Sequence, residues 1–150
     1  MATISLKAQG RVGAPAGRVY TILADYNQHH PKILPPAFTD LKVEEGGVGA
    51  GTVFSVTMKV AGRTRTARMY VAEPQPGRVL TESEPTTSLL TTFTVVPDGD
   101  TSRVQIATTW QGAKGIGGFF ERLFAPRLLQ RIYVQELKNL DRYARQQTSL

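Results

Sequence analysis

The only two histidines of the chain, His29 and His30, stand side by side in the segment DYNQHHPKILPP, residues 25–36. An imidazole can ligate a metal ion or transfer a proton near neutral pH. Adjacent side chains point about 100° apart on a helix and to opposite faces of a strand, so the two rings cannot readily share one metal. The chain has no HxH or HExxH spacing and no cysteine, so we expect no metal site and no cofactor.

The same segment contains prolines at positions 31, 35 and 36, which bend or break a helix. The pattern therefore predicts a bent connection in which the histidines form a surface or turn-capping pair. The alternative is that one ring lines a ligand pocket, with His30 as the candidate. There it would donate a hydrogen bond to a ligand carbonyl or act as an acid/base group.

Glu136 is a carboxylate inside an apolar helical pattern. On steps of about 100° it falls within a stripe that contains Leu129, Tyr133 and Leu140. A carboxylate is seldom buried without a partner. Glu136 should therefore either reach the rim or face a cavity, where it would pair with an inward arginine or a polar ligand group. With His30, Tyr26 and Tyr133 it completes the set of candidate acid/base residues.

The spacing of apolar residues changes along the chain, from the period of a strand to that of a helix. The opening ATISLKAQGRV alternates Ile4, Leu6 and Ala8 with polar neighbours, as a half-buried strand does. The next segment, GAPAGRVYTILADY, has a helical period with Pro15 in its first turn. A short second helix or irregular turn should follow at the prolines.

The middle and end of the chain predict a meander of strands and then a long helix. Six strand-like runs lie between FTDLKVEE and SRVQIATTW, separated by turns such as AGR, PQPG and DGD. Good helix formers dominate from Ile116 to about Gln146, and Pro126 should kink or break that helix. The glycine-rich EGGVGAG before TVFSVTMKV lacks the Lys-Ser/Thr ending of a phosphate-binding loop and is predicted to be a turn.

Large apolar side chains of the predicted strands could face the predicted C-terminal helix. They either pack as ordinary core or line a cavity that suits a flat apolar ligand. The candidates are Phe54, Met58, Phe93 and Trp110 from the strands, and Leu129 and Tyr133 from the helix.

The composition is that of an ordinary globular protein, with 150 residues, 41% hydrophobic and 20% charged. No apolar run approaches the roughly 20 residues needed to cross a bilayer. The N-terminal segment MATISLKAQGRVGAPA lacks the basic start and apolar stretch of a signal peptide. We therefore expect a single domain over residues 1–150, located in the cytoplasm.

The formal net charge of +6 raises the question of nucleic-acid binding. The basic residues are scattered, with Arg63, Arg65 and Arg68 in the middle and others near the end. They are not interleaved with aromatic residues as in known RNA-binding signatures. The pattern favours a solvated basic face and no specific nucleic-acid partner.

The chain resembles the START/Bet v 1-like (SRPBCC) superfamily, and most closely its polyketide cyclase/dehydrase-like branch. The resemblance rests on VGAPAGRVYTILADYNQHHPKI (12–33), EGGVGAGTVF (45–54), VAEPQPGRVL (71–80) and SRVQIATTW before the terminal helix. It implies an α+β helix-grip fold, in which a curved antiparallel sheet of about seven strands wraps around a long C-terminal helix. Two short helices should follow the first strand.

The resemblance also implies an internal cavity for a small hydrophobic or amphipathic molecule. Members of the superfamily include lipid carriers, hormone receptors and aromatic polyketide cyclases, and fold alone does not choose among such functions. The leading hypothesis is a non-enzymatic carrier of a lipid, aromatic or polyketide-like ligand. The alternatives are a cyclase or dehydratase that uses cavity acid/base residues, and a macromolecular-interaction module with a basic surface. Two or more convergent polar groups in the cavity would favour the enzyme.

Overall fold

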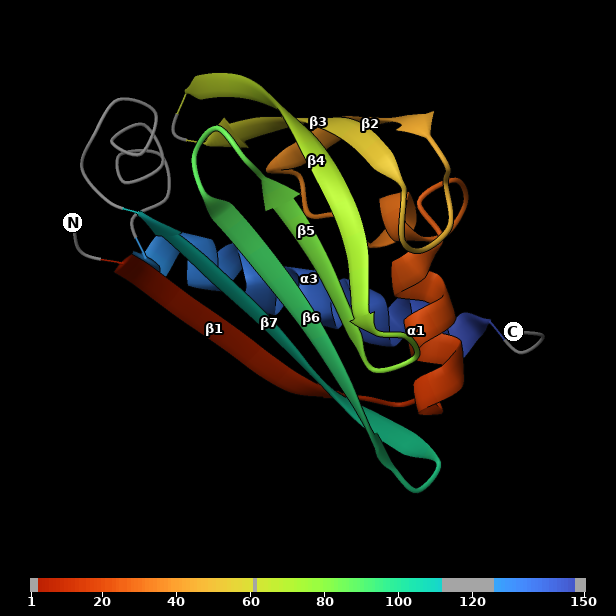
Figure 1. Ribbon diagram of the computed structural model, residues 1–150. Helices are drawn as coiled ribbons and strands as arrows, with labels where there is room; N and C mark the ends of the chain where they lie inside the picture. Colours follow the sequence, from red (N-terminus) through yellow and green to blue (C-terminus); the bar gives the residue numbers. More distant parts are fainter. Residues whose placement is uncertain (1–2, 61, 112–125, 148–150) are drawn as a thin grey trace.

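The computed structural model describes residues 3–60, 62–111 and 126–147. Within these ranges seven strands form one antiparallel sheet, and a long helix lies against it (Figure 1). The strands are β1 (Thr3–Val12), β2 (Phe38–Glu45), β3 (Val53–Val60), β4 (Arg63–Gln75), β5 (Val79–Glu84), β6 (Leu89–Asp98) and β7 (Thr101–Gln111). The helices are α1 (Ala16–Ala24), the 3-10 helix η1 (His30–Ile33) and α3 (Pro126–Gln146).

The sheet has the order β1-β7-β6-β5-β4-β3-β2. Strands β2 to β7 therefore pair with their neighbours in sequence, which confirms the predicted meander. The first strand returns to the far edge and pairs with β7 along its whole length, from Thr3 opposite Gln111 to Val12 opposite Ser102. The fold is the helix-grip fold that the resemblance implied.

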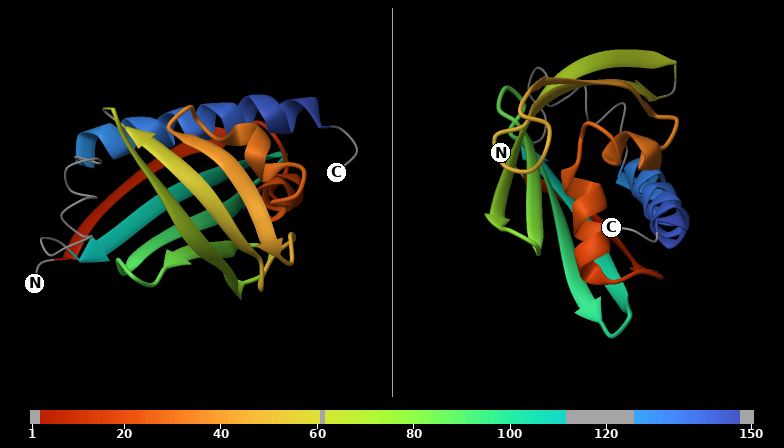
Figure 2. Two further views of the ribbon diagram at one scale, coloured as in Figure 1. Left: turned by 90° about the horizontal axis from the view of Figure 1, so that it is seen from above. Right: turned by 90° about the vertical axis from the view of Figure 1, so that its right-hand side faces the viewer.

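Irregular pairing accompanies the curvature of the sheet. The register shifts between Thr39 and Lys42 in β2, and again between Ala72 and Gln75 in β4. Such bulges bend a strand and increase its twist. The sheet curves around α3, which crosses its open side (Figure 2).

The predicted apolar stripe of α3 packs against the concave side of the sheet. Leu129, Tyr133, Leu137, Leu140 and Ala144 are all buried, and only Ile132 of the stripe is partly exposed. The described helix starts at Pro126. Proline suits the first turn of a helix, because the N–H that it lacks would have no intrahelical partner there. The part of the predicted helix before Pro126 lies outside the described residues.

The connection after α1 corrects the prediction of a surface histidine pair. Both rings are buried, with His29 5% and His30 2% exposed. The Nδ1 atom of His29 lies 2.7 Å from the hydroxyl of Tyr143 on α3, and Asn139 of the same helix donates a hydrogen bond to the carbonyl of Ile33. The partners come from a helix more than a hundred residues later, so local sequence could not predict this burial.

The glycine-rich turn holds the end of α1. The carbonyl of Gly47 accepts a 2.8 Å hydrogen bond from the amide of Tyr26, and the amide of Gly49 donates a 2.9 Å bond to the carbonyl of Ala24. Gly47 has a φ of 140°, which side-chain-bearing residues rarely adopt. The predicted turn is confirmed, and it fixes the direction in which the chain leaves α1.

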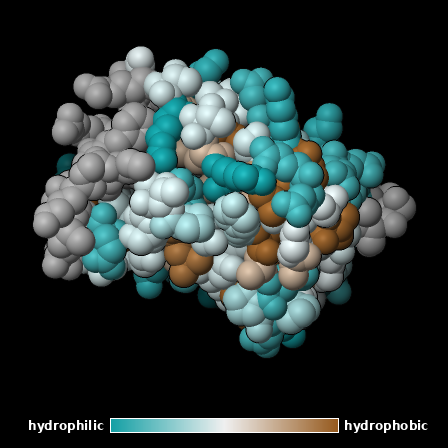
Figure 3. Space-filling view, turned by 45° about the horizontal axis from the view of Figure 1, so that its top comes forward, coloured by the Kyte–Doolittle hydropathy of each residue, from teal (hydrophilic) through white to brown (hydrophobic). Residues whose placement is uncertain are grey.

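Apolar side chains appear only as separate patches on the face drawn in Figure 3. The large hydrophobic residues that are exposed within the described ranges come from a loop, two strands and a helix: Val48, Tyr70, Leu90, Val96 and Val134. No helix in the described part of the chain is both long and apolar enough to span a membrane.

Candidate functional site

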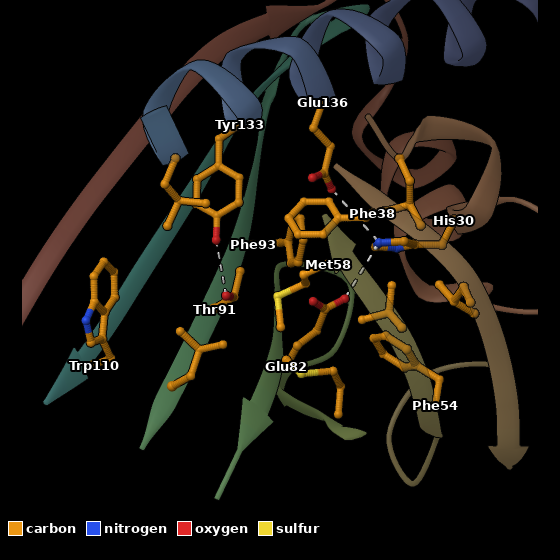
Figure 4. A pocket seen from close by; sticks show the side chains of 16 residues that line it. His30, Phe38, Phe54, Met58, Glu82, Thr91, Phe93, Trp110, Tyr133 and Glu136 are labelled. Atoms are coloured by element: carbon orange, nitrogen blue, oxygen red, sulfur yellow. Dashed lines mark hydrogen bonds and ion pairs between the residues drawn. The ribbon is translucent and has the colours of Figure 1, made fainter. Parts of the chain in front are cut away.

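A cavity lies between the concave side of the sheet and α3 (Figure 4). Its volume is about 60 Å³. Of the residues expected from the sequence to line a cavity, these do so: His30, Phe54, Met58, Phe93, Trp110, Leu129, Tyr133 and Glu136.

Tyr26 is the one predicted residue outside the cavity wall, and it lies directly behind that wall. Its ring stacks on His30 with a centroid distance of 4.4 Å and on Phe54 at 4.7 Å. Its hydroxyl donates a 2.5 Å hydrogen bond to Oε2 of Glu82. Tyr26 therefore supports two of the residues that face the cavity.

Sequence reasoning missed half of the lining. The residues concerned are Leu34, Phe38, Leu41, Val56, Met69, Glu82, Leu89 and Thr91. The most important is Glu82, because it is charged. A signal for it exists in VLTESE, the sequence of β5, where burial alternates so that Leu80, Glu82 and Glu84 are all buried. Glu82 stands two residues after Leu80, so strand alternation predicts that both side chains point to the same face.

His30 is held in one orientation by the backbone of α1. Its Nδ1 atom lies 2.7 Å from the carbonyl oxygen of Leu23. A carbonyl only accepts, so Nδ1 carries a proton and donates it. The other ring nitrogen, Nε2, points into the cavity (Figure 4). It lies 3.6 Å from Oε2 of Glu82 and 4.0 Å from Oε2 of Glu136.

The two carboxyl groups come from opposite walls of the cavity, Glu82 from β5 and Glu136 from α3. Glu136 is 3% exposed, so it does not reach the rim, and among the described residues it lies near the imidazole of His30 rather than an arginine. Burial raises the pKa of Glu136 well above its ordinary value, and the charge of Glu82 raises it further. Burial also raises the pKa of Glu82, against the opposing effects of His30 and of the Tyr26 hydrogen bond. The pair therefore retains protons to a higher pH than exposed carboxyl groups would.

A second polar group lies further along the cavity. The Tyr133 hydroxyl bonds to Thr108, and it lies 3.5 Å from Thr91. The two threonine hydroxyls are 2.8 Å apart. Burial is the main cause that raises the pKa of Tyr133, so this side chain stays a neutral phenol that can donate or accept a hydrogen bond.

The described residues contain no group of three or more His, Cys, Asp or Glu side chains placed to hold a metal ion. The chemistry that this arrangement offers is proton transfer. An imidazole nitrogen and two carboxyl groups meet at one point of a mostly apolar cavity, and a phenol stands nearby.

The sequence also matches a family model, over residues 3–145, whose description is polyketide cyclase/dehydrase and lipid transport. The chain belongs to this family. The match covers almost the whole chain and confirms the START/Bet v 1-like resemblance. This description supports a ligand-binding or cyclase function in general terms. A search of curated proteins finds no match.

Solved structures agree with the family assignment. The KanY protein, solved by NMR, is 34% identical, with 97% of this chain and 99% of that chain covered and a TM-score of 0.83. The Zhui aromatase/cyclase from Streptomyces sp. R1128 is 20% identical, with 97% and 95% covered and a TM-score of 0.69. Norcoclaurine synthase from Thalictrum flavum, in complex with dopamine and hydroxybenzaldehyde, is 17% identical, with 99% and 90% covered and a TM-score of 0.72. At these identities the last two show the shared fold alone.

Proposed function

We propose that the protein binds a small, flat, amphipathic carbonyl compound in the cavity and catalyses an acid/base step on it, of the cyclase or dehydratase type. The observation that carries this proposal is the placement of His30 Nε2 between Glu82 and Glu136 on the cavity wall. A carrier of apolar molecules has no need for three buried ionisable groups, which are costly to bury. Perturbed carboxyl groups in a cleft are typical of sites that transfer protons.

In the proposed step, His30 Nε2 removes a proton from a carbon next to the substrate carbonyl. The Nδ1–H group, fixed on the Leu23 carbonyl, keeps Nε2 free for this role. The imidazolium that forms is stabilised by the Glu82 carboxylate, which the Tyr26 hydroxyl holds in place. The proton then passes to a hydroxyl on the β-carbon of the substrate, which leaves as water while a C=C bond forms between the α- and β-carbons, so that His30 acts first as a base and then as an acid.

Comparison with the two other functions supports this choice. A uniformly apolar cavity would favour a carrier, and this cavity contains convergent polar groups at two points. An interaction module would need a concentrated basic patch. Of the described arginines, Arg11, Arg68 and Arg145 each pair with a carboxylate. The similarity to an aromatase/cyclase and to a synthase bound to hydroxybenzaldehyde agrees with a small aromatic carbonyl substrate.

The proposal is tested by proton exchange on a model ketone. β-Tetralone is a flat bicyclic ketone, and exchange of its α-protons in D₂O can be followed by NMR. The wild-type protein should accelerate exchange over buffer, and His30→Gln should remove most of the acceleration, by about 10²-fold or more. His29→Gln is the matched control, because His29 bonds to Tyr143 outside the cavity wall, and it should keep the activity.

Displacement of an apolar fluorescent dye shows in parallel whether each variant still binds the ketone. Equal exchange rates for wild-type protein and His30→Gln would exclude His30 as the base. If the protein binds the dye but does not accelerate exchange, the result would favour a carrier over an enzyme.

A further inference from the structure

The carboxylate of Glu136 is buried and makes no hydrogen bond to any described residue. It projects from α3 into the cavity (Figure 4). Oε2 of Glu136 lies 4.0 Å from His30 Nε2, which exceeds hydrogen-bonding distance. Buried polar groups are nearly always paired. Within the described part of the chain Glu136 has no such partner, and a ligand in the cavity is a candidate for it.

The charges around the cavity indicate what kind of partner is missing. Glu82 and Glu136 face one imidazole, and the described lining contains neither lysine nor arginine. Glu82 already accepts a hydrogen bond from Tyr26 and lies nearer to His30 than Glu136 does. Among the residues that the structure describes, Glu136 thus has no hydrogen-bond donor and no basic group nearer than His30 Nε2 at 4.0 Å.

Aromatic rings surround the same point. Phe38 of β2 and Phe93 of β6 line the same cavity as Glu136 (Figure 4). Phe93 also meets the edge of His30 at a centroid distance of 5.7 Å. Aromatic faces attract cations through their quadrupole, and the attraction is stronger where water is excluded. A carboxylate among aromatic rings is a suitable environment for an organic ammonium group.

We propose that the ligand of this cavity carries a basic nitrogen, which Glu136 binds as an ammonium group. The inference rests on the proposed function, because it assumes that the cavity takes a small molecule. It extends that function by naming the substrate class, a small aromatic carbonyl compound that also carries an amine on a short chain. Glu136 then anchors the ligand, and His30 with Glu82 remains the proton-transferring pair.

Binding of an ammonium group next to Glu136 should change the number of protons that the protein holds. The groups that face Glu136 are His30 from η1, Glu82 from β5 and Tyr133 from its own helix, with Tyr26 behind them. In this setting burial and the Glu82 charge raise the pKa of Glu136. An amine is already protonated in water at neutral pH. Its binding as ammonium favours the carboxylate form, so it should lower the pKa of Glu136 and release protons in the pH range between the two pKa values.

The test compares phenethylamine with phenethyl alcohol, which has nearly the same shape and no charge. Isothermal titration calorimetry in buffers of different ionisation enthalpy, with EDTA present, gives both the affinity and the number of protons released. The amine should bind the wild-type protein about tenfold more tightly or better, since a charge-assisted hydrogen bond replaces a neutral one. Proton release should accompany the amine and not the alcohol.

Variants then assign the effect to one residue. Glu136→Gln should abolish the preference for the amine and leave the affinity for the alcohol unchanged. Glu45→Gln makes the same change in net charge at an exposed side chain of β2. This variant should keep the preference for the amine. The proton count on the wild-type protein is independent of any variant, so a Glu136→Gln protein that fails to fold does not remove the test.

The possible failures are distinct. Equal affinities for amine and alcohol, or amine binding without proton release, would overturn this inference and leave the cavity as a binding site. A preference that survives in Glu136→Gln would overturn the role of Glu136. If neither compound nor β-tetralone displaces an apolar dye, the proposed function fails, and the inference fails with it. Loss of amine binding when EDTA is replaced by zinc would indicate a metal site instead.

Discussion

At the scale of single residues, Tyr133 shows how a side chain can line a cavity and still stabilise the fold. Its ring is buried on α3, and its hydroxyl meets Thr108 and Thr91. These two threonines also bond to each other at 2.8 Å, so their hydroxyls keep a partner if the tyrosine is removed. One side of the ring faces space that already exists, and its deletion creates less new cavity than deletion of a fully packed ring.

We therefore expect Tyr133→Ala to lower the free energy of unfolding by less than the roughly 3–5 kcal/mol typical of emptying a packed aromatic site. Leu140→Ala is the control on the same helix. Leu140 is 1% exposed and lies away from the cavity, and its loss should cost about 2–5 kcal/mol. Denaturant melts measure both, and dye affinity should change for Tyr133→Ala alone. A larger loss for Tyr133→Ala with unchanged dye binding would make it a packing residue.

At the scale of elements, the glycine turn between β2 and β3 decides where α1 ends and where Tyr26 points. Gly47 combines a φ of 140° with close approach, since a Cβ there would lie 2.1 Å from Nδ2 of Asn27. Its carbonyl also receives the amide of Tyr26. The turn thus links the backbone after α1 to the Tyr26–Glu82 hydrogen bond behind the cavity.

Gly47→Ala should lower the free energy of unfolding by roughly 1–3 kcal/mol, because alanine is strained at this φ. Gly17→Ala provides the opposite case. Gly17 lies in α1, and a Cβ there meets nothing within 4 Å, so alanine should stabilise the protein by about 0.5–1 kcal/mol. Thermal or denaturant melts compare the two. Equal stability of both variants would show that the turn adapts to a side chain.

At the scale of the whole molecule, the buried carboxyl groups link stability to pH. A carboxyl group whose pKa is raised in the folded protein binds protons more strongly when folded than when unfolded. Between the two pKa values stability then falls as pH rises. Glu136, with its raised pKa, should therefore weaken the fold at neutral and alkaline pH and have little effect in acid.

Glu136→Gln should raise the free energy of unfolding at neutral pH relative to the wild type. The difference should shrink as pH falls and vanish below the pKa of an unfolded glutamate, about 4.3. Denaturant melts over a pH series measure it, with Glu45→Gln as the exposed control. A Glu136→Gln protein that is less stable than the wild type at neutral pH would show that the carboxylate is stabilised by its surroundings.

The sequence by itself determined the fold and much of the apolar lining. Alternation in the strands, turn signals between them and the stripe of α3 are local patterns, because side-chain direction repeats every 2 residues in a strand and every 3.6 in a helix. Phe54, Met58 and Phe93 could be placed on inward faces for this reason. Glu136 was also found, since a carboxylate within an apolar stripe is visible along one helix.

Only the tertiary structure decided what chemistry these residues form together. His30, Glu82 and Glu136 belong to η1, β5 and α3, and no pattern within one of these elements shows that they meet. They meet because the register of the sheet and the crossing of α3 bring three distant segments to one point. The same packing buries both histidines, through Tyr143 for one ring and the Leu23 carbonyl for the other. The spacing of residues within one helix or strand cannot predict this meeting, because it depends on contacts between different elements.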